Sequence, residues 1–349
     1  MKKLRIAQVA PLWFSVPPLK YGGTERIISG LTEELAKRGH HVTLFAPKMS
    51  KTKAKLVSLI NDGLISQGGL WTNDYNWNLF NHSFAFEHSS SFDIIHCHWN
   101  GMGAFFQHFL KTPVIHTMHN NISRSAQIKW KPFEYYRDTF KPVFISKSEQ
   151  DLCPIRFKKS WIVYNGINLN QFDFNPNPQN HFIWIARISP EKGPLEAIEI
   201  AERAGIKLLL AGQIQPNHRE YFDKEIKPRL NSQIQYVGEL SQEQLSEFYG
   251  SAQGCLYPID WEEPFGLIMA ESMACGTPVI VFDRGSAREV VEDGKTGFIV
   301  KDINAAVEAI KKIKQIDRKE CRKRVEENFT IKKMVDNYEK IYQDVVEEN

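Results

Sequence analysis

Apolar positions follow two different periods along the first half of the chain. A short apolar run at residues 4–10 predicts a buried strand, and apolar residues then recur at helical spacing from Ile27 to Leu35, before Gly39. Further β-rich runs predict strands at residues 42–46, 92–97, 113–118, 142–145 and 161–164. Strands that alternate with helices in this way are typical of a doubly wound parallel sheet. Residues 50–90 have mixed periodicity, and we assign them no element.

A segment rich in asparagine and proline, at residues 165–181, separates this series from a second one. The second series predicts strands at residues 181–186, 206–211, 234–237, 255–258 and 278–282. Helices are expected from Pro194, at 242–252 and at 266–275. The predicted domains are therefore residues 1–168 and 178–330. Both are expected to be Rossmann-like α/β domains that face each other across a cleft, where the carboxyl ends of parallel strands bind ligands.

The last segment, residues 331–349, carries an apolar stripe at helical spacing from Ile331 to Val345. A helix with such a stripe must pack on another surface. Because no strand is expected after it, we expect this helix to return to the first domain.

Length and composition are those of a protein with two cores. The chain has 349 residues, of which 42% are hydrophobic, which suits two domains of roughly 100–200 residues each. No apolar run approaches the ~20 residues that a membrane-spanning helix needs. Gln8 and Pro11 interrupt the N-terminal apolar stretch before a signal-peptide core forms, so a cytoplasmic location is expected. Five scattered cysteines without a close pair fit a reducing compartment.

Charge is distributed unevenly between the halves. Residues 1–170 contain 21 basic and 11 acidic residues, a net charge of +10, and the remaining 23 basic and 30 acidic residues give −7. This asymmetry suggests that the two halves meet different ligands. A chance drift of surface charge is the alternative.

Two loops at the ends of predicted strands carry residues suited to binding phosphate. Gly22 and Gly23 precede the first helix, where backbone amides and the helix dipole favour an anion. Arg187 and Lys192 flank the loop after the strand at 181–186, and two cations there suit a diphosphate leaving group. A simple turn and a solvated loop are the alternative interpretations.

A third segment combines carboxylates with a helix entry. Glu263 is expected on a loop, Pro264 is expected to fix the entry of the helix, and Glu271 follows eight residues after Glu263. The amides of Phe265, Gly266 and Leu267 would lie at the helix N-terminus, where phosphate binds. Eight residues of helix span ~12 Å, about the distance from the ribose to the hexose of a nucleotide sugar.

Taken in order, these segments resemble the retaining GT-B glycosyltransferases of family 4. The resemblance extends along most of the chain and rests on Gly22-Gly23-Thr24-Glu25, His98 after the strand that contains Asp93 to His96, His119, Phe144-Ile145-Ser146, Asn165-Gly166-Ile167, Arg187 with Lys192-Gly193, Gly238, Glu263-Pro264-Phe265-Gly266 and Glu271. Several motifs in the right order are more specific than any one of them.

The resemblance implies a donor site in the second domain. Arg187 and Lys192 would hold the donor diphosphate and stabilise the leaving group, Glu263 would bind hydroxyls of the transferred hexose, and Glu271 would bind the ribose. Gly22 and Gly23 would let the backbone approach the diphosphate, and the amides of residues 265–267 would complete the donor site.

The resemblance also implies roles for two histidines and a mechanism. His119 would lie beneath the reacting sugar, and His98 would lie nearer the acceptor. The leaving phosphate itself would take the proton of the acceptor, so no side chain need be a nucleophile and no cofactor is required beyond the donor.

Within the family, the segment from Ala10 to Glu25 is most similar to the subgroup of the tetrahydrobiopterin and avilamycin glucosyltransferases, which favours UDP-glucose as donor and leaves the acceptor undefined. A GDP-mannose-type donor with a lipid or polysaccharide acceptor is an alternative. A sugar-nucleotide 2-epimerase is a second alternative, although such enzymes lack the context of Glu263-Pro264-Phe265-Gly266-Leu267. A non-catalytic sugar-nucleotide-binding protein is a third, and the occupied polar positions argue against it.

Three other signals bear on ligands. The histidines at 96, 98, 116 and 119 lack a nearby carboxylate, so no metal site is expected. Residues 124–141 interleave basic and aromatic side chains, which indicates either an ordinary amphipathic segment or a surface for an anionic acceptor or the inner face of a membrane. No nucleic-acid recognition motif is present, so the expected partners are a sugar nucleotide and its acceptor.

Overall fold

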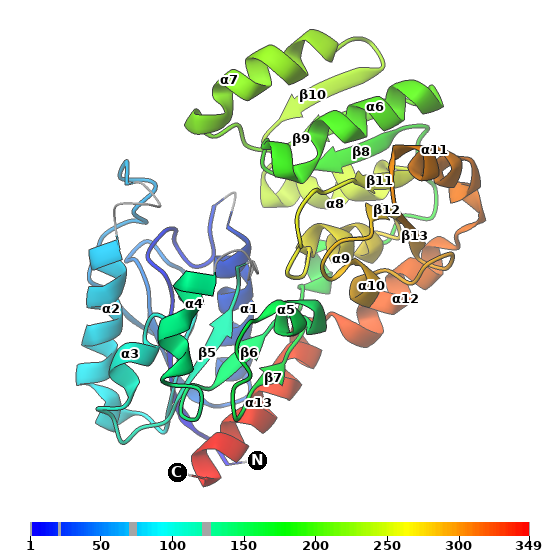
Figure 1. The fold of residues 1–349 in the computed structure, drawn as a ribbon. Helices are drawn as coiled ribbons and strands as arrows, with labels where there is room; N and C mark the ends of the chain where they lie inside the picture. The colour runs from blue at the N-terminus through cyan, green and yellow to red at the C-terminus, as the bar shows by residue number, and fades with distance from the viewer. Residues whose placement is uncertain (1, 20–21, 70–74, 121–126, 349) are drawn as a thin grey trace. The chain divides into compact units, whose positions relative to one another are not determined.

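The chain folds into two compact α/β units in a computed structural model, which describes residues 2–19, 22–69, 75–120 and 127–348. Unit 1 comprises Met1–Gly166 together with Ile331–Asn349, and unit 2 is the continuous segment Ile167–Thr330 (Figure 1). Each unit has one sheet with only parallel strands among its recorded pairings. The prediction of two doubly wound, Rossmann-like domains is confirmed.

Unit 1 is built on a seven-stranded sheet in the order β3-β2-β1-β4-β5-β6-β7. Its strands are β1 (Arg5–Val9), β2 (His41–Phe45), β3 (Lys55–Val57), β4 (Ile94–Cys97), β5 (Val114–Met118), β6 (Pro142–Phe144) and β7 (Trp161–Ile162). The chain runs outward from β1 to β3 and then returns to β4, on the other side of β1. The strand order therefore reverses between β1 and β4, which is the position where such sheets bind ligands.

Helices connect these strands. They are α1 (Gly23–Lys37), α2 (Tyr75–Glu87), α3 (Ala104–Gln107), α4 (Gln127–Glu134) and α5 (Lys147–Leu152). The segment that received no assignment from the sequence contains β3 and α2. Helix α2 mixes apolar and polar residues on all sides, with Asn78, Asn81 and His82 buried and Trp77 and Phe80 exposed, which explains why its periodicity gave no clear signal.

The C-terminal helix α13 (Ile331–Glu347) is part of unit 1 and packs against α1. An ion-pair cluster joins the two segments, because Glu339 accepts hydrogen bonds from Arg38 Nη1 at 2.6 Å and from His40 Nε2 at 2.8 Å. Glu339 is 3% exposed. A buried carboxylate that is shared by an arginine and a histidine ties the end of the chain to its beginning.

Unit 2 is built on a six-stranded sheet in the order β10-β9-β8-β11-β12-β13. Its strands are β8 (Phe182–Ile185), β9 (Leu208–Ala211), β10 (Ile234–Gly238), β11 (Gly254–Tyr257), β12 (Val279–Phe282) and β13 (Gly297–Val300). The main helices are α6 (Pro194–Ala204), α8 (Gln242–Ser251), α9 (Leu267–Ala274), α11 (Ile303–Lys312) and α12 (Arg318–Asn328), with short α7 (Arg219–Tyr221) and α10 (Ala287–Val290). Here the strand order reverses between β8 and β11.

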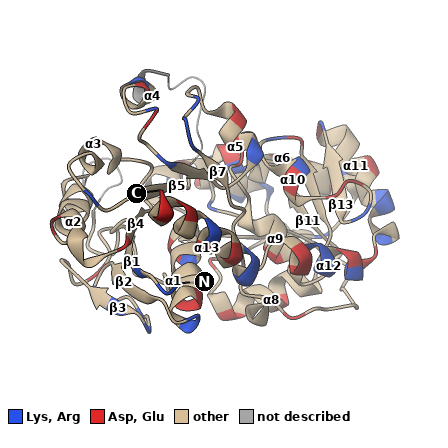
Figure 2. Ribbon diagram, turned by 90° about the horizontal axis from the view of Figure 1, so that it is seen from below, with Lys and Arg blue, Asp and Glu red and all other residues tan. Residues whose placement is uncertain are grey.

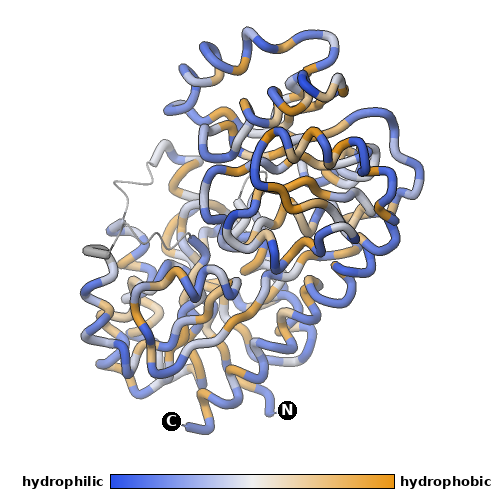
Figure 3. The backbone as a smooth tube through the Cα atoms, turned by 45° about the vertical axis from the view of Figure 1, so that its right-hand side comes forward, coloured by the Kyte–Doolittle hydropathy of each residue, from blue (hydrophilic) through white to orange (hydrophobic). Residues whose placement is uncertain are grey.

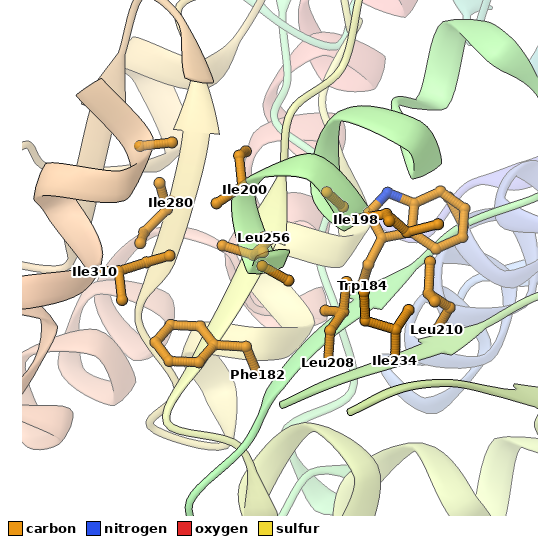
Figure 4. Close-up of a cluster of buried hydrophobic side chains, with 14 of the residues drawn as sticks. Phe182, Trp184, Ile198, Ile200, Leu208, Leu210, Ile234, Leu256, Ile280 and Ile310 are labelled. Carbon is orange, nitrogen blue, oxygen red and sulfur yellow. The ribbon is translucent and has the colours of Figure 1, made fainter. Parts of the chain in front are cut away.

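A hydrophobic cluster joins this sheet to α6 and α11 (Figure 4). Trp184 on β8 is fully buried, and Ile198 of α6 and Ile310 of α11 belong to the same cluster. The indole N–H of Trp184 donates to the carbonyl of Lys192 at 3.1 Å, which satisfies its buried polar atom. The core thereby also positions the loop that follows β8.

Strand β13 and helices α11 and α12 were not predicted from the sequence. Helix α12 has the sequence Arg-Lys-Glu-Cys-Arg-Lys-Arg-Val-Glu-Glu-Asn, and basic and acidic residues mix along it (Figure 2). Only Cys321 and Val325 of this helix are buried, so its apolar stripe is too narrow to produce a strong periodic signal.

Hydrophobic segments concentrate along the strands inside the units, and hydrophilic segments lie on the outer helices (Figure 3). Among the described residues, no helix combines the length and the apolar character that crossing a membrane requires.

Candidate functional site

The candidate site in unit 2 lies at the carboxyl ends of β8 and β11, the neighbouring strands between which the strand order reverses. The loop after β8 carries Arg187 and Lys192, and the loop after β11 carries Glu263. Residues that are 71 positions apart in the chain are therefore brought to one edge of the sheet.

Glu263 is the centre of this site. Its Oε2 accepts hydrogen bonds from Lys192 Nζ at 2.8 Å, from the hydroxyl of Tyr257 at 2.6 Å and from the indole N–H of Trp261 at 2.8 Å. All three donors converge on one carboxylate oxygen. In the described part of the chain Oε1 makes no hydrogen bond, so it is available to accept one from a ligand.

The carboxylate of Glu263 is held in its charged form. Burial works to raise its pKa, but the charge of Lys192 and the hydrogen bonds from Lys192, Tyr257 and Trp261 outweigh burial and lower it. The side chains of Glu263 and Lys192 are only 10% and 11% exposed. The ammonium group also lies 4.0 Å from the ring centroid of Trp261.

A close backbone approach fixes the Lys192 loop. Lys192 ends a short 3-10 turn (Pro190–Lys192), and Gly193 follows with a φ of 70°. A Cβ atom on Gly193 would lie 1.9 Å from the carbonyl oxygen of Pro258, just beyond β11. Only glycine permits this contact between the two loops.

A second loop braces Glu263 from the other side. The amide of Ser286 donates to the carbonyl of Glu263 at 2.9 Å, and the amide of Gly285 donates to the carboxylate of Glu262 at 2.6 Å. A Cβ atom on Gly285 would lie 2.3 Å from both the backbone N and the backbone O of Glu263. The hydroxyl of Ser286 also donates to the carbonyl of Phe265 at 2.8 Å, so this second loop supports both Glu263 and the entry of α9.

Arg187 is not part of the Glu263 cluster. Its Nη2 donates to Glu191 Oε1 at 2.8 Å, and the hydroxyl of Ser189 donates to the same oxygen at 2.6 Å. Arg187 Nε is buried and has no hydrogen-bond partner in the described part of the chain. The pairing with Glu191 holds the guanidinium close to the end of β8 and leaves one donor unsatisfied.

Helix α9 begins at Leu267, and Gly266 precedes it with a φ of 76°. Pro264 lies three residues before the first helical residue, so the expectation that this proline fixes the entry of the helix is wrong. Phe265 is 1% exposed and packs edge-on against Phe329, with ring centroids 5.5 Å apart. Burial of this ring anchors the loop so that the backbone at 265–267 lies at the start of the helix.

Glu271 lies on the same helix and is 5% exposed. Its Oε2 accepts a hydrogen bond from the hydroxyl of Tyr249 at 2.8 Å. Like Glu263, this carboxylate is buried and held by a tyrosine that the sequence analysis did not identify. Neither tyrosine stands out in sequence, because Tyr257 ends the apolar strand β11 and Tyr249 occupies one of the buried positions of the amphipathic helix α8.

In unit 1, Gly22 and Gly23 lie at the start of α1, after the loop that follows β1. Gly22 has a φ of 145°, and a Cβ atom there would lie 2.8 Å from Pro18 and 3.1 Å from Glu25 Oε2. Glu25 is buried in the first turn, and burial raises its pKa to about 8. A carboxyl group that is mostly uncharged at neutral pH does not repel an anion at this helix end.

His98 and His119 follow the adjacent strands β4 and β5. His98 Nδ1 lies 3.0 Å from His119 Nε2, and the two rings are stacked with centroids 5.3 Å apart. His98 Nε2 also lies 2.7 Å from Oε1 of Gln8, a residue of β1 that sequence reasoning missed. Burial lowers the pKa of His119 to about 3, so its imidazole is neutral.

The structure also describes most of the basic and aromatic segment at 124–141. Trp130, Phe133 and Phe140 are buried in one hydrophobic cluster, whereas Tyr135 is 86% exposed. Most of these aromatic side chains thus fill the core of unit 1. Residues 121–126 lie outside the described residues. Within the described ranges, no group of three or more histidine, cysteine, aspartate or glutamate side chains is arranged to hold a metal ion.

Comparisons with known proteins match both units. Residues 168–330 match the family "Glycosyl transferases group 1", and residues 21–171 match "Glycosyltransferase Family 4". A relative, an uncharacterised glycosyltransferase of Methanocaldococcus jannaschii, is 25% identical over 337 residues, which cover 84% of this chain and 85% of the relative.

Solved structures share the fold over the whole chain. Sucrose-phosphate synthase from Thermosynechococcus elongatus has a TM-score of 0.81 at 21% identity and covers 100% of both chains. A protein from Anabaena in complex with UDP-glucose has a TM-score of 0.75 at 16% identity, with 98% of this chain and 100% of that chain covered. At such identities the likeness shows a common fold.

Proposed function

We propose that this chain, which belongs to the GT-B glycosyltransferases of group 1, transfers glucose from UDP-glucose to an acceptor with retention of anomeric configuration. Unit 2 is the proposed donor domain, and unit 1 is the proposed acceptor domain. The proposal rests on the buried cluster of Glu263 and Lys192 at the point where the strand order of unit 2 reverses.

This cluster offers opposite charges to two parts of one donor. Glu263 uses only Oε2 for its three internal donors, which leaves Oε1 to accept hydrogen bonds from hexose hydroxyls. Lys192 gives one of its three N–H donors to Glu263 and can direct the others at the diphosphate. A buried cation there stabilises the negative charge that develops as the nucleotide leaves.

Other residues would complete the donor site. We propose that Arg187 contacts the diphosphate and that Glu271 accepts hydrogen bonds from the ribose hydroxyls. The backbone amides at 265–267, at the start of α9, would also face phosphate oxygens. Glu271 is buried and polar beside this helix entry, which supports its assignment.

Residues of unit 1 would serve the sugar and its acceptor. We propose that Gly22 and Gly23 bring backbone amides to the diphosphate, that His119 accepts a hydrogen bond from a hydroxyl of the transferred sugar and that His98 lies toward the acceptor. Both histidines are neutral, as hydroxyl recognition by a lone pair requires.

The proposed reaction occurs on one face of the sugar. The bond between the anomeric carbon and the phosphate oxygen breaks, and the acceptor oxygen forms its bond from the same side. The acceptor proton passes to the departing phosphate, so no protein carboxylate acts as nucleophile. Arg187 and Lys192 stabilise the leaving group in the transition state.

The choice of UDP-glucose is supported by the resemblance of residues 10–25 and by the structurally similar Anabaena protein, which was solved with UDP-glucose. Calorimetric titration with UDP, UDP-glucose, GDP and GDP-mannose tests it directly. We expect UDP and UDP-glucose to bind, and we expect Lys192→Met and Glu271→Gln to weaken both. Glu339→Gln is the matched control, because it removes a similarly buried carboxylate from unit 1.

The outcomes separate the alternatives. Preference for GDP-mannose would replace the proposed donor, and sugar-nucleotide isomerisation without any acceptor would indicate a 2-epimerase. Binding that neither unit 2 substitution affects would show that the donor site has been assigned wrongly. Once an acceptor is found, proton NMR of the product reports its anomeric configuration, and inversion would contradict the proposed single-face reaction.

A further inference from the structure

A continuous chain of hydrogen bonds links the C-terminal helix to His119. Tyr342 of α13 lies with its hydroxyl 2.7 Å from His96 Nδ1 and accepts a hydrogen bond from Gln8 Nε2 at 3.0 Å. Gln8 Oε1 lies 2.7 Å from His98 Nε2, and His98 Nδ1 lies 3.0 Å from His119 Nε2. Gln8, His96 and Tyr342 are fully buried, and His98 is 2% exposed. All five residues belong to unit 1.

The orientation of the Gln8 amide determines where each proton lies. Because Nε2 of Gln8 donates to Tyr342, its Oε1 faces His98, and an amide oxygen can only accept. His98 must therefore carry its proton on Nε2. Burial and the neighbouring imidazoles lower the pKa of His98, so the ring is neutral and its Nδ1 is an acceptor.

The same logic extends to His119. Since His98 Nδ1 accepts, His119 Nε2 must donate, and the neutral ring then has a bare lone pair on Nδ1. His119 Nδ1 makes no hydrogen bond within the described ranges of the chain. The network thus leaves His119 Nδ1 as an unused hydrogen-bond acceptor at the end of β5.

On the far side, Tyr342 is also set by the network. Its hydroxyl accepts from Gln8, which leaves its own proton to donate to His96 Nδ1. His96 Nε2 then donates to Thr117 Oγ1 at 2.7 Å, and Thr117 lies 2.8 Å from the hydroxyl of Tyr338. Tyr338 is therefore at the opposite end of the chain of bonds from His119.

We propose that Tyr342 and Gln8 are positioning residues that hold His119 in the tautomer with its proton on Nε2, so that Nδ1 accepts a hydrogen bond from a sugar hydroxyl. The substrate contact in this statement rests on the proposed function, whereas the tautomer does not. Without the Tyr342 hydroxyl, the amide of Gln8 has no acceptor for Nε2 and loses the preference for one orientation. A flipped amide would donate to His98 and reverse both histidine tautomers.

Tyr342→Phe and Tyr338→Phe form a matched pair for testing this proposal. Both remove one hydroxyl from a buried tyrosine on α13, one helical turn apart. Long-range nitrogen–proton NMR on protein labelled with ¹⁵N-histidine reads the tautomer of each ring, and a His119→Asn variant identifies the His119 signals. We expect Tyr338→Phe to keep His119 protonated on Nε2 and Tyr342→Phe to show a mixture with the Nδ1–H tautomer.

Binding provides the second measurement. The apparent affinity for UDP-glucose should fall in proportion to the fraction of His119 that keeps the Nε2–H tautomer, which is about twofold for an equal mixture. The affinity for UDP should not change, because UDP has no hexose hydroxyl to donate. Gln8→Leu should have the same effect through the other positioning residue, and thermal unfolding shows whether each variant is folded.

The positioning role of Tyr342 and Gln8 and the sugar contact of His119 can be refuted independently. A single Nε2–H tautomer of His119 in both folded Tyr342→Phe and folded Gln8→Leu would overturn the positioning role. A tautomer mixture without any change in the ratio of UDP-glucose to UDP affinity would overturn the proposed sugar contact of His119.

Discussion

The contributions of Lys192 and Glu263 to the stability of unit 2 should be strongly coupled. Both side chains are about nine-tenths buried, and the ammonium and carboxylate are 2.8 Å apart. Removing one partner of a buried pair typically costs about 3–5 kcal/mol, because the other charge stays buried without compensation. Tyr257 and Trp261 remain as neutral donors to Glu263, so we expect Lys192→Met to destabilise unit 2 by about 3 kcal/mol.

A double-mutant cycle isolates this coupling. Glu263→Gln alone leaves Lys192 over Trp261 and should cost about 2 kcal/mol, since the amide oxygen can still accept a hydrogen bond. The double variant Lys192→Met/Glu263→Gln carries neither charge. Its loss of unfolding free energy should therefore be smaller than the sum of the two single losses by about 2 kcal/mol. The exposed pair of Lys147 and Asp151 is the control, and Lys147→Met should cost less than about 0.5 kcal/mol.

Hydrogen exchange of peptides from β11 and α9, measured across a urea series, is the appropriate assay, because a chain with two units need not unfold in one transition. Dependence on pH supplies a second check. The pKa of Glu263 is lowered in the folded state, so the pair stabilises unit 2 above the unfolded value of 4.5 and loses this effect as the pH falls through the folded pKa. The difference in unfolding free energy between wild type and Lys192→Met should therefore become smaller in acid. Single effects that add within about 0.5 kcal/mol would refute the reasoning.

Two further substitutions test the supports of each unit. Gly285→Ala introduces a Cβ atom 2.3 Å from the backbone of Glu263, so it should shift that residue. We expect calorimetry to show UDP-glucose binding weakened by at least about tenfold, or 1.4 kcal/mol. Unchanged affinity would show that the contact between this loop and Glu263 is not needed for binding. Burial acts to raise the pKa of Glu339, but hydrogen bonds from His40 and Arg38 lower it, so its contribution to stability is present above 4.5 and lost in acid. Glu339→Gln should therefore lower the melting temperature at neutral pH more than in acid, and an equal loss at both would count against the ion pair as the cause.

The elements nearest the proposed donor site were predictable from sequence. The strands that became β8 and β11 are short apolar runs with turn residues after them, and such runs keep their pattern wherever they pack. Lys192 and Glu263 were both expected in one donor site, and the structure brings them into direct contact. Their proposed roles toward the donor remain predictions.

What the sequence did not reveal depends on contacts between distant segments. Tyr257 and Tyr342 each read as one apolar position in an element, because periodicity records burial and not the partner of a hydroxyl group. Gln8 is a polar residue in a buried strand, which is a signal that could have been followed. Strand β13 was missed because its apolar run, Phe298–Val300, is only three residues long and follows a polar turn.

The division of the chain also has a consequence for its synthesis. Unit 2 is one uninterrupted stretch, whereas unit 1 needs α13, and Gln8 meets Tyr342 across 334 positions of sequence. On the ribosome, the second unit can finish folding before the first has received its last helix, although domains usually mature from the N-terminus. Until α13 is synthesised, the surface of unit 1 that α13 covers stays exposed, and His96 and Gln8 have no hydrogen bond to Tyr342. A chain that stops before residue 331 would thus be released with its proposed acceptor domain unfinished and its proposed donor domain intact.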